Sequence, residues 1–271
     1  MSVDASRSPR VRPTVPVATV AFVIYVVIFI GLMKLSGFAY TDIFNTTEGA
    51  LRGAVLPLAA GSLWLIVFIA VARWDFVFRD PRKLSMGFWL WLAPILMLIT
   101  LALQFIAVTW SSFDIGHLLA IVAAAILVGF AEETLFRGII LRALRNGDRS
   151  EGMAVLFSSL WFGLFHLTNL IVGAGATVIF QVVVATLAGV GLYLARRGTG
   201  LLIAGMVLHG LWDLSSFLVG VHADDTLKLI GPFVGYAAYA ACLAALIIIL
   251  RRDRTTHMLA TDEVPAVVRQ P

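Results

Sequence analysis

The chain has 271 residues, of which 60% are hydrophobic and only 13% are charged, and its mean hydropathy is +0.95. An ordinary globular domain carries about 25% charged residues, and a soluble fold cannot hide this much apolar surface. The composition therefore excludes a soluble enzyme, a disordered chain, a secreted disulfide scaffold and a nucleic-acid-binding domain. The single cysteine, Cys242, allows neither an internal disulfide nor a cysteine-based zinc site. The sequence predicts an all-α, polytopic membrane protein.

Eight apolar segments are long enough to cross about 30 Å of hydrocarbon, which takes roughly 20 helical residues. We expect about eight transmembrane helices at 17–35, 53–72, 88–109, 117–141, 153–171, 174–195, 200–219 and 231–250. The first is interpreted as a retained anchor, because it is longer than a signal-peptide core and lacks a small-x-small cleavage site. The fifth span is less hydrophobic at its far end, which contains His166, Thr168 and Asn169.

These spans divide the chain into five consecutive parts. We expect a cytoplasmic tail at 1–16, three N-terminal helices within 17–116, a catalytic core of four helices at 117–219, a last loop and helix at 220–250, and a cytoplasmic tail at 251–271.

The basic residues predict the orientation of the chain, because cytoplasmic loops collect Lys and Arg. With both termini inside, sixteen basic residues lie on the cytoplasmic side, and only Lys34, Arg52 and Lys228 lie on the other. The sixteen are Arg7, Arg10, Arg12, Arg73, Arg79, Arg82, Lys83, Arg142, Arg145, Arg149, Arg196, Arg197, Arg251, Arg252, Arg254 and Arg269. We interpret them as topology signals in a cell membrane, with a small addition from contact with anionic lipids.

Six ionisable residues lie inside three of the spans, where charge is costly and suggests function. They are Glu132, Glu133 and Arg137 in the fourth span, His166 in the fifth, and His209 and Asp213 in the seventh. At about 1.5 Å per residue, the three helices bring both histidines and two or three of the carboxylates to one level, somewhat past mid-membrane from the cytoplasm. The sequence therefore predicts that they form a single site.

The spacings suggest different roles. Glu133 and Arg137 are four residues apart, which favours a structural or orienting pair on one helix face and leaves Glu132 free. His209 and Asp213 have the same spacing, so the carboxylate could hold the imidazole in one tautomer, or both could ligate a metal.

Histidines and carboxylates around a cavity favour the activation of water. Either a divalent metal such as zinc, held by His166, His209 and Asp213, acidifies the water, or Glu132 with His166 takes its proton directly. Peptide hydrolysis is the expected reaction. A proton-coupled transporter could use the same residue types, so chemistry alone leaves both open.

Three motifs in order resemble the CPBP intramembrane proteases, also called the CAAX protease and bacteriocin-processing (Abi) family. They are Glu132-Glu133-Thr-Leu-Phe-Arg137, Phe162-Gly-Leu-Phe-His166 and His209-Gly-Leu-Trp-Asp213, and the likeness covers roughly residues 120–217. The third motif ends here in Asp, where the eukaryotic prenyl protease has Asn.

The resemblance implies a glutamate-dependent endopeptidase, often described as a metalloprotease, that acts on a membrane-associated protein or peptide. It makes Glu132 the catalytic glutamate, His166 its water-activating partner, and His209 with Asp213 the third-motif pair. The alternative is a non-proteolytic transporter or a bacteriocin-immunity or scaffold protein that uses the same cluster.

Overall fold

The computed structural model describes residues 9–80, 86–147, 149–225, 227 and 230–256. The predicted cytoplasmic residues Arg7, Arg82, Lys83 and Arg269, and Lys228 on the other side, lie outside these ranges, as do most of the two predicted tails.

Eight helical segments in the described part of the chain are long and apolar enough to cross a membrane. They are Val15–Ser36, Thr47–Ala72, Phe88–Ala107, Ile115–Arg145, Glu151–Val172, Val178–Thr199, Leu202–Val221 and Gly231–Arg252. No strand occurs among the described residues, and only two isolated bridges, Arg79 with Leu201 and Val108 with Ala223, pair extended backbone. The all-α, eight-span prediction is confirmed, with span ends that differ by a few residues.

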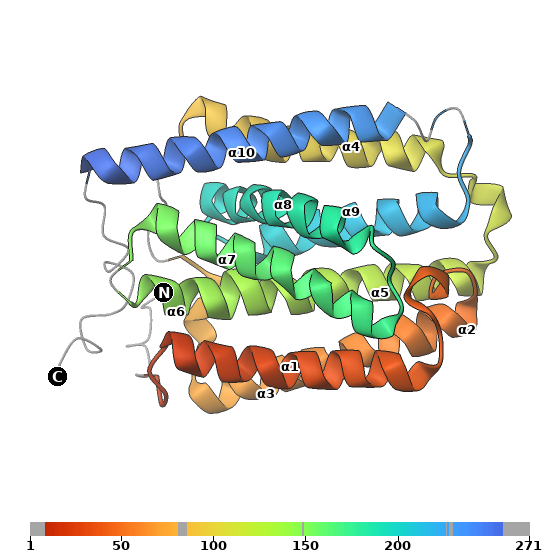
Figure 1. Cartoon of the computed structure of the whole chain (residues 1–271), viewed down its shortest axis with the longest axis horizontal. Helices are drawn as coiled ribbons and strands as arrows, with labels where there is room; N and C mark the ends of the chain where they lie inside the picture. Colours follow the sequence, from red (N-terminus) through yellow and green to blue (C-terminus); the bar gives the residue numbers. More distant parts are fainter. Residues whose placement is uncertain (1–8, 81–85, 148, 226, 228–229, 257–271) are drawn as a thin grey trace, which may run out of the picture.

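The helices are arranged in three layers (Figure 1). In the middle lie α5 (Ile115–Glu133), α7 (Glu151–Phe165), α8 (Val178–Thr199) and α9 (Leu202–Val221). On one side of them α1 (Val15–Ser36) packs against α3 (Leu56–Ala72), and on the other α4 (Leu92–Ala107) packs against α10 (Ile230–Thr256).

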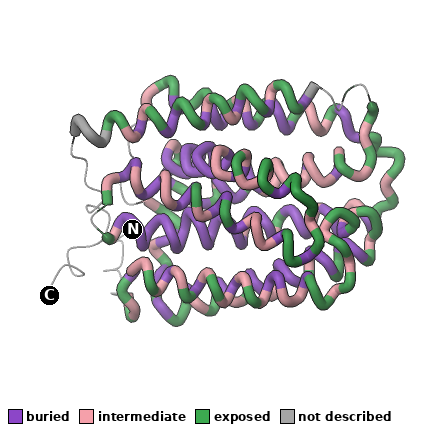
Figure 2. The backbone as a smooth tube through the Cα atoms, viewed as in Figure 1, coloured by how far each residue is buried: buried purple, intermediate pink, exposed green. Residues whose placement is uncertain are grey.

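The core of the molecule coincides with the middle layer. Of the most apolar 18-residue stretch of each helix, 50% of the residues are buried in Ile115–Arg145 and 56% in Val178–Thr199, against 28% in α1. The outward faces of the peripheral helices carry exposed apolar side chains, which a lipid environment accommodates without cost (Figure 2). Polar groups placed in the middle layer are therefore shielded from both lipid and water.

Two transmembrane helices change their winding at the predicted motifs. The helix α5 continues after Glu133 as a π-helix, Thr134–Ile140, before α6 (Leu141–Arg145). The helix α7 tightens at His166 into a 3-10 helix, His166–Val172, where side chains of His166 and Thr168 bond to the carbonyls of Phe162 and Phe165. Such departures from α-helical winding are frequent at functional sites.

Hydrogen bonds between loops and helix ends mark the two ends of the bundle. At one end Asn146 Nδ2 donates to the carbonyl of Pro13 at 2.9 Å, and Asp80 N donates to the carbonyl of Gly200 at 2.9 Å. At the other end Asp224 N donates to the carbonyl of Ala107 at 2.9 Å. The loops thus assemble in the two groups that an even number of spans requires.

A neighbouring helix approaches α7 closely at Gly163. A Cβ built on Gly163 would lie 2.6 Å from the carbonyl oxygen of Val182 in α8. Since a real Cβ could not occupy that position, only glycine lets the two backbones meet here.

Candidate active site

His209 lies at the centre of the buried polar cluster. Its Nδ1 is 3.0 Å from Glu133 Oε1, and its Nε2 is 3.5 Å from Asp213 Oδ2 and 3.9 Å from Glu132 Oε2. The helices α5 and α9, which run against each other, supply all four side chains. The structure thus brings together the glutamates of the first motif and the pair of the third.

Glu133 has a second partner that its spacing did not predict. Its Oε1 accepts from Arg137 Nη1 at 2.7 Å, as expected for residues four apart, and the same oxygen contacts His209 Nδ1. Because Glu133 pairs with a guanidinium it is ionised and can only accept, so the proton of His209 sits on Nδ1. Glu133 rather than Asp213 therefore fixes the tautomer of His209 and directs its Nε2 toward Glu132 and Asp213.

The ion pair of Glu133 and Arg137 is packed on all sides. Both side chains have 0% exposed area, and the Arg137 guanidinium lies 4.3 Å above the ring of Phe162. A Cβ on Gly205 of α9 would lie 2.8 Å from Glu133 Oε2. The glycine thus allows α9 to approach the pair closely enough for His209 to reach it.

Phe162 also separates the two histidines. Its ring meets that of His166 edge to face with centroids 5.0 Å apart, and that of His209 likewise at 5.5 Å. His166 Nδ1 lies 2.9 Å from the carbonyl oxygen of Phe162, which can only accept a hydrogen bond. The proton of neutral His166 is therefore on Nδ1, and its Nε2 is available to a water or a substrate.

A cavity of about 310 Å³ opens beside these groups. Glu132, His166 and Asp213 contribute to its wall, as do Tyr40 and Gln181. Apolar side chains form most of the rest: Phe29, Met33, Ile43, Phe44, Leu58, Val128, Phe165 and Phe217. A second cavity, of about 220 Å³, is bordered by His166, His209 and Asp213 from the side of α4 and α8. The predicted catalytic groups thus border enclosed space on two sides.

Glu132 has spare hydrogen-bonding capacity on the cavity wall. It is 6% exposed, and its Oε2 has no hydrogen-bond partner among the described residues. A buried carboxylate oxygen without a partner is costly in a purely structural site. Its position on the cavity wall is what a proton acceptor for a bound water requires.

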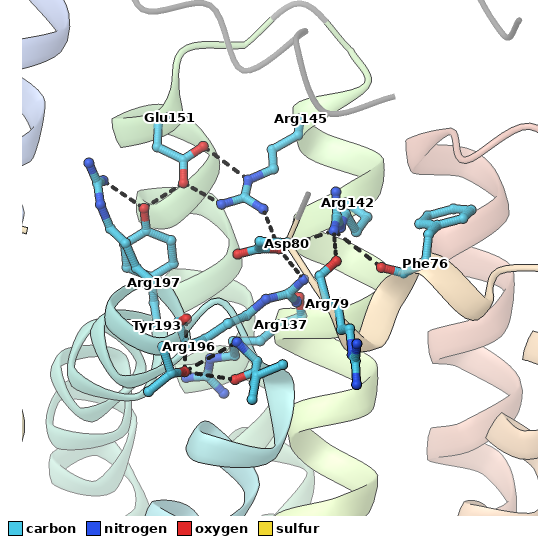
Figure 3. Close-up of polar contacts among 12 residues, drawn as sticks. Phe76, Arg79, Asp80, Arg137, Arg142, Arg145, Glu151, Tyr193, Arg196 and Arg197 are labelled. Carbon is cyan, nitrogen blue, oxygen red and sulfur yellow. Dashed lines mark hydrogen bonds and ion pairs between the residues drawn. The ribbon is translucent and has the colours of Figure 1, made fainter. Parts of the chain in front are cut away.

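A second polar cluster occupies the predicted cytoplasmic end (Figure 3). Asp80 accepts from Arg142 Nη2 at 3.1 Å, from Arg145 Nη1 at 3.3 Å and from Arg196 Nη2 at 2.5 Å. Arg196 also donates to the carbonyl of Arg137, which joins this cluster to the buried ion pair of Arg137 and Glu133.

Glu151 extends the same cluster toward α7 and α8. It accepts from Arg145 Nε at 2.9 Å and from the hydroxyl of Tyr193 at 2.5 Å, and Tyr193 in turn accepts from Arg197 Nη1 at 2.8 Å.

The arginines of this cluster differ from the sequence interpretation, which gave them only topology and lipid contact. Arg142, Arg145, Arg196 and Arg197 are between 0% and 7% exposed. They are buried because Asp80 and Glu151 compensate their charge inside the bundle. Burial of Asp80 raises the pKa of its carboxyl, but the adjacent arginines lower it more, so the net shift is downward.

The predicted metal ligands do not form a preformed site. Among the residues that the structure describes, no group of three or more His, Cys, Asp or Glu side chains is arranged to hold a metal ion. His166 lies across Phe162 from His209, and Nδ1 of His209 is already used by Glu133. Zinc therefore stays a prediction.

Comparison with known families assigns the central part of the chain. Residues 114–215 match the family described as type II CAAX prenyl endopeptidase, Rce1-like. The chain contains an Rce1-like domain. This domain begins at the N-cap residue of α5 and ends within α9, so it holds all three motifs and every side chain of the site. No curated protein and no solved structure matches the chain.

The match of residues 114–215 to the Rce1-like family supports an endopeptidase of the CAAX-protease type, and the eight apolar helices support a multi-pass membrane protein. The first three spans and the last lie outside the Rce1-like domain, although α1 and α3 pack beside it and help to enclose the larger cavity.

Proposed function

We propose that the protein is an intramembrane glutamate-dependent endopeptidase that hydrolyses a peptide bond in a membrane-associated protein or peptide. The observation that carries the proposal is the geometry of Glu132, whose carboxylate has an unpartnered buried oxygen on the wall of a cavity shared with His166. The match of residues 114–215 to the Rce1-like family adds to it.

In the proposed reaction a water bound between Glu132 and His166 Nε2 loses a proton to Glu132. Its oxygen bonds to the carbonyl carbon of the substrate, whose oxygen takes up the negative charge. The C–N bond then breaks, and the proton on Glu132 passes to the leaving nitrogen, which gives a free carboxyl and a free amine. No further reactant is needed.

His209 and Asp213 act on the other side of the reacting carbonyl. Glu133 holds the Nδ1 proton of His209, and in the proposed reaction Nε2 carries a second proton, which it donates to the oxygen that becomes negative. Asp213, 3.5 Å from the same Nε2, positions the imidazole and does not contact the oxyanion, because an ionised carboxylate would repel it.

The test is cleavage of a quenched peptide library by the purified protein in detergent, beside Glu132→Gln. This variant keeps the shape of the side chain and removes the base, so the rate should fall about 10²–10⁴-fold with an unchanged melting temperature. Activity retained in Glu132→Gln would refute the role of Glu132. An inactive wild type would favour the transporter or immunity alternative. A chelator and added zinc test the predicted metal in the same assay.

We also propose a cell-membrane location with both termini in the cytoplasm, supported by the sixteen-to-three distribution of basic residues. In a Cys242→Ser background, a cysteine at Ser150 should be shielded from a membrane-impermeant thiol reagent added to intact cells. Cysteines at Thr46 and Asp224 should be labelled. The opposite pattern would invert the topology.

A further inference from the structure

Three uncharged polar side chains form a hydrogen-bonded chain on the wall of the larger cavity. Asn169 Nδ2 donates to Gln181 Oε1 at 3.1 Å, and Gln181 Nε2 donates to the hydroxyl oxygen of Tyr40 at 3.1 Å. All three border the cavity that also contains Glu132 and His166. They come from three separate segments: the 3-10 helix after α7, the helix α8, and the short helix Tyr40–Asp42 after α1.

The 3-10 winding after α7 sets Asn169 directly beside His166. In a 3-10 helix residues three apart lie on one face, whereas an α-helix would turn them about 60° away from each other. The change of winding at His166 therefore aligns the amide of Asn169 with the imidazole along the same wall.

The direction of the hydrogen bonds determines what the chain offers to a ligand. Both ends of the Gln181 carboxamide are used by its neighbours. This leaves the Asn169 Oδ1 as an acceptor and the Tyr40 O–H hydrogen as a donor, and no partner for either is present in the described part of the chain. One acceptor and one donor, held at a fixed separation, complement the N–H and C=O of an extended peptide backbone.

The electrostatics of the cavity agree with a neutral ligand. Burial raises the pKa of the Tyr40 hydroxyl, and the hydrogen bond from Gln181 opposes this only in part. The carboxyl groups of Asp213 and Glu132 raise it further, so Tyr40 remains a donor at neutral pH. Neither Lys nor Arg contributes to the cavity wall, so an acidic substrate side chain would find no partner there.

We propose that Asn169, Gln181 and Tyr40 form a backbone-binding rail that holds an uncharged, apolar stretch of substrate in extended form against Glu132 and His166. Asn169 Oδ1 accepts a substrate N–H, Tyr40 donates to a substrate C=O, and Gln181 sets the distance between them. This inference rests on the proposed function and adds to it the conformation and the class of residues next to the scissile bond.

The first experiment separates binding from chemistry in Gln181→Leu. With the best-cleaved library peptide, KM should rise about tenfold while kcat changes less than threefold. The matched control is Gln104→Leu, which removes another membrane glutamine whose Oε1 accepts from Ser215 Oγ at 2.6 Å and which borders neither cavity. The control should keep the wild-type KM. If Gln181→Leu does not fold, Tyr40→Phe, which removes a single oxygen, gives the same readout.

The second experiment replaces each backbone amide of the peptide in turn by an ester, which removes one N–H. In the wild type, one position should lower kcat/KM about tenfold, and this loss should disappear in Asn169→Leu. A merely structural asparagine would not select one position. Glu132-dependent cleavage with an unchanged KM in Gln181→Leu, or an ester effect that persists in Asn169→Leu, overturns the rail alone. Absence of Glu132-dependent cleavage overturns the proposed function and the rail together.

Discussion

The protein contains two buried clusters of carboxylates and cations that differ in how fully the carboxylate oxygens are hydrogen-bonded. In the cluster of Figure 3, Asp80 accepts from three arginines and Glu151 from an arginine and a tyrosine. In the site around His209, one oxygen of Glu132 and one of Glu133 have no hydrogen-bond partner among the described residues. Burial of charge alone does not distinguish the two.

The difference indicates which cluster does chemistry. Carboxylates saturated with donors have no capacity left for a substrate, and the value of their network lies in fixing the helices relative to one another. A cluster with open acceptors beside a cavity can bind water and move a proton. Carboxylates within a membrane helix bundle should therefore be ranked by their unpaired atoms and not by their charge.

The most damaging single change should be Glu133→Gln, because Glu133 both pairs with the buried Arg137 and holds the imidazole of His209. It leaves Arg137 buried without a counter-ion, which costs about 3–5 kcal/mol, and it releases His209. Melting temperature and cleavage should fall together. Adding Arg137→Met should recover much of the stability but not the activity.

Glu48 provides the matched control for that experiment. It forms the same four-residue-spaced pair with Arg52 at 2.7 Å, but the two side chains are 65% and 56% exposed. Glu48→Gln should change stability by no more than about 0.5 kcal/mol. A fully folded but inactive Glu133→Gln would instead assign Glu133 to chemistry alone.

Asp80→Asn tests the saturated cluster. It leaves three arginines close together without their shared carboxylate and should cost about 3 kcal/mol at neutral pH, with KM nearly unchanged in the folded fraction. Because the folded-state pKa of Asp80 is lowered from its ordinary value of 3.8, ionised Asp80 stabilises the protein above that pH. The stabilisation is lost as the pH falls through the lowered pKa. Melting temperatures of wild type and variant should thus converge only in strong acid, and a constant difference would contradict the assignment.

Asp213→Asn should have the smallest of these effects. If the carboxylate positions His209, the amide should lower kcat/KM about 10–100-fold. A variant of full activity would show that a neutral group suffices, as expected for an oxyanion donor. Impairment that a chelator leaves unchanged would retain the positioning role and remove the metal.

The sequence was sufficient for the spans, for the resemblance to the family and for the meeting of three helices at one depth, because hydrophobic length and helical rise determine them. It did not reveal that Glu133 reaches His209. The spacing to Arg137 already accounted for Glu133, and the rotation of α9 against α5 depends on packing at glycines such as Gly205. The burial of Arg196 was equally hidden, since its partner Asp80 lies 116 residues away in a loop.

The contacts of Asp80 also constrain the order in which the protein can be assembled. This carboxylate leaves the ribosome before Arg142, Arg145 and Arg196 do, so at first it has no counter-charge and remains hydrated at the membrane surface. Arg142 and Arg145 follow with the fourth span, but the full set of three donors forms only after the sixth span is synthesised, because Arg196 lies at the end of that helix. The contacts of Asp80 are therefore completed by a late step of synthesis.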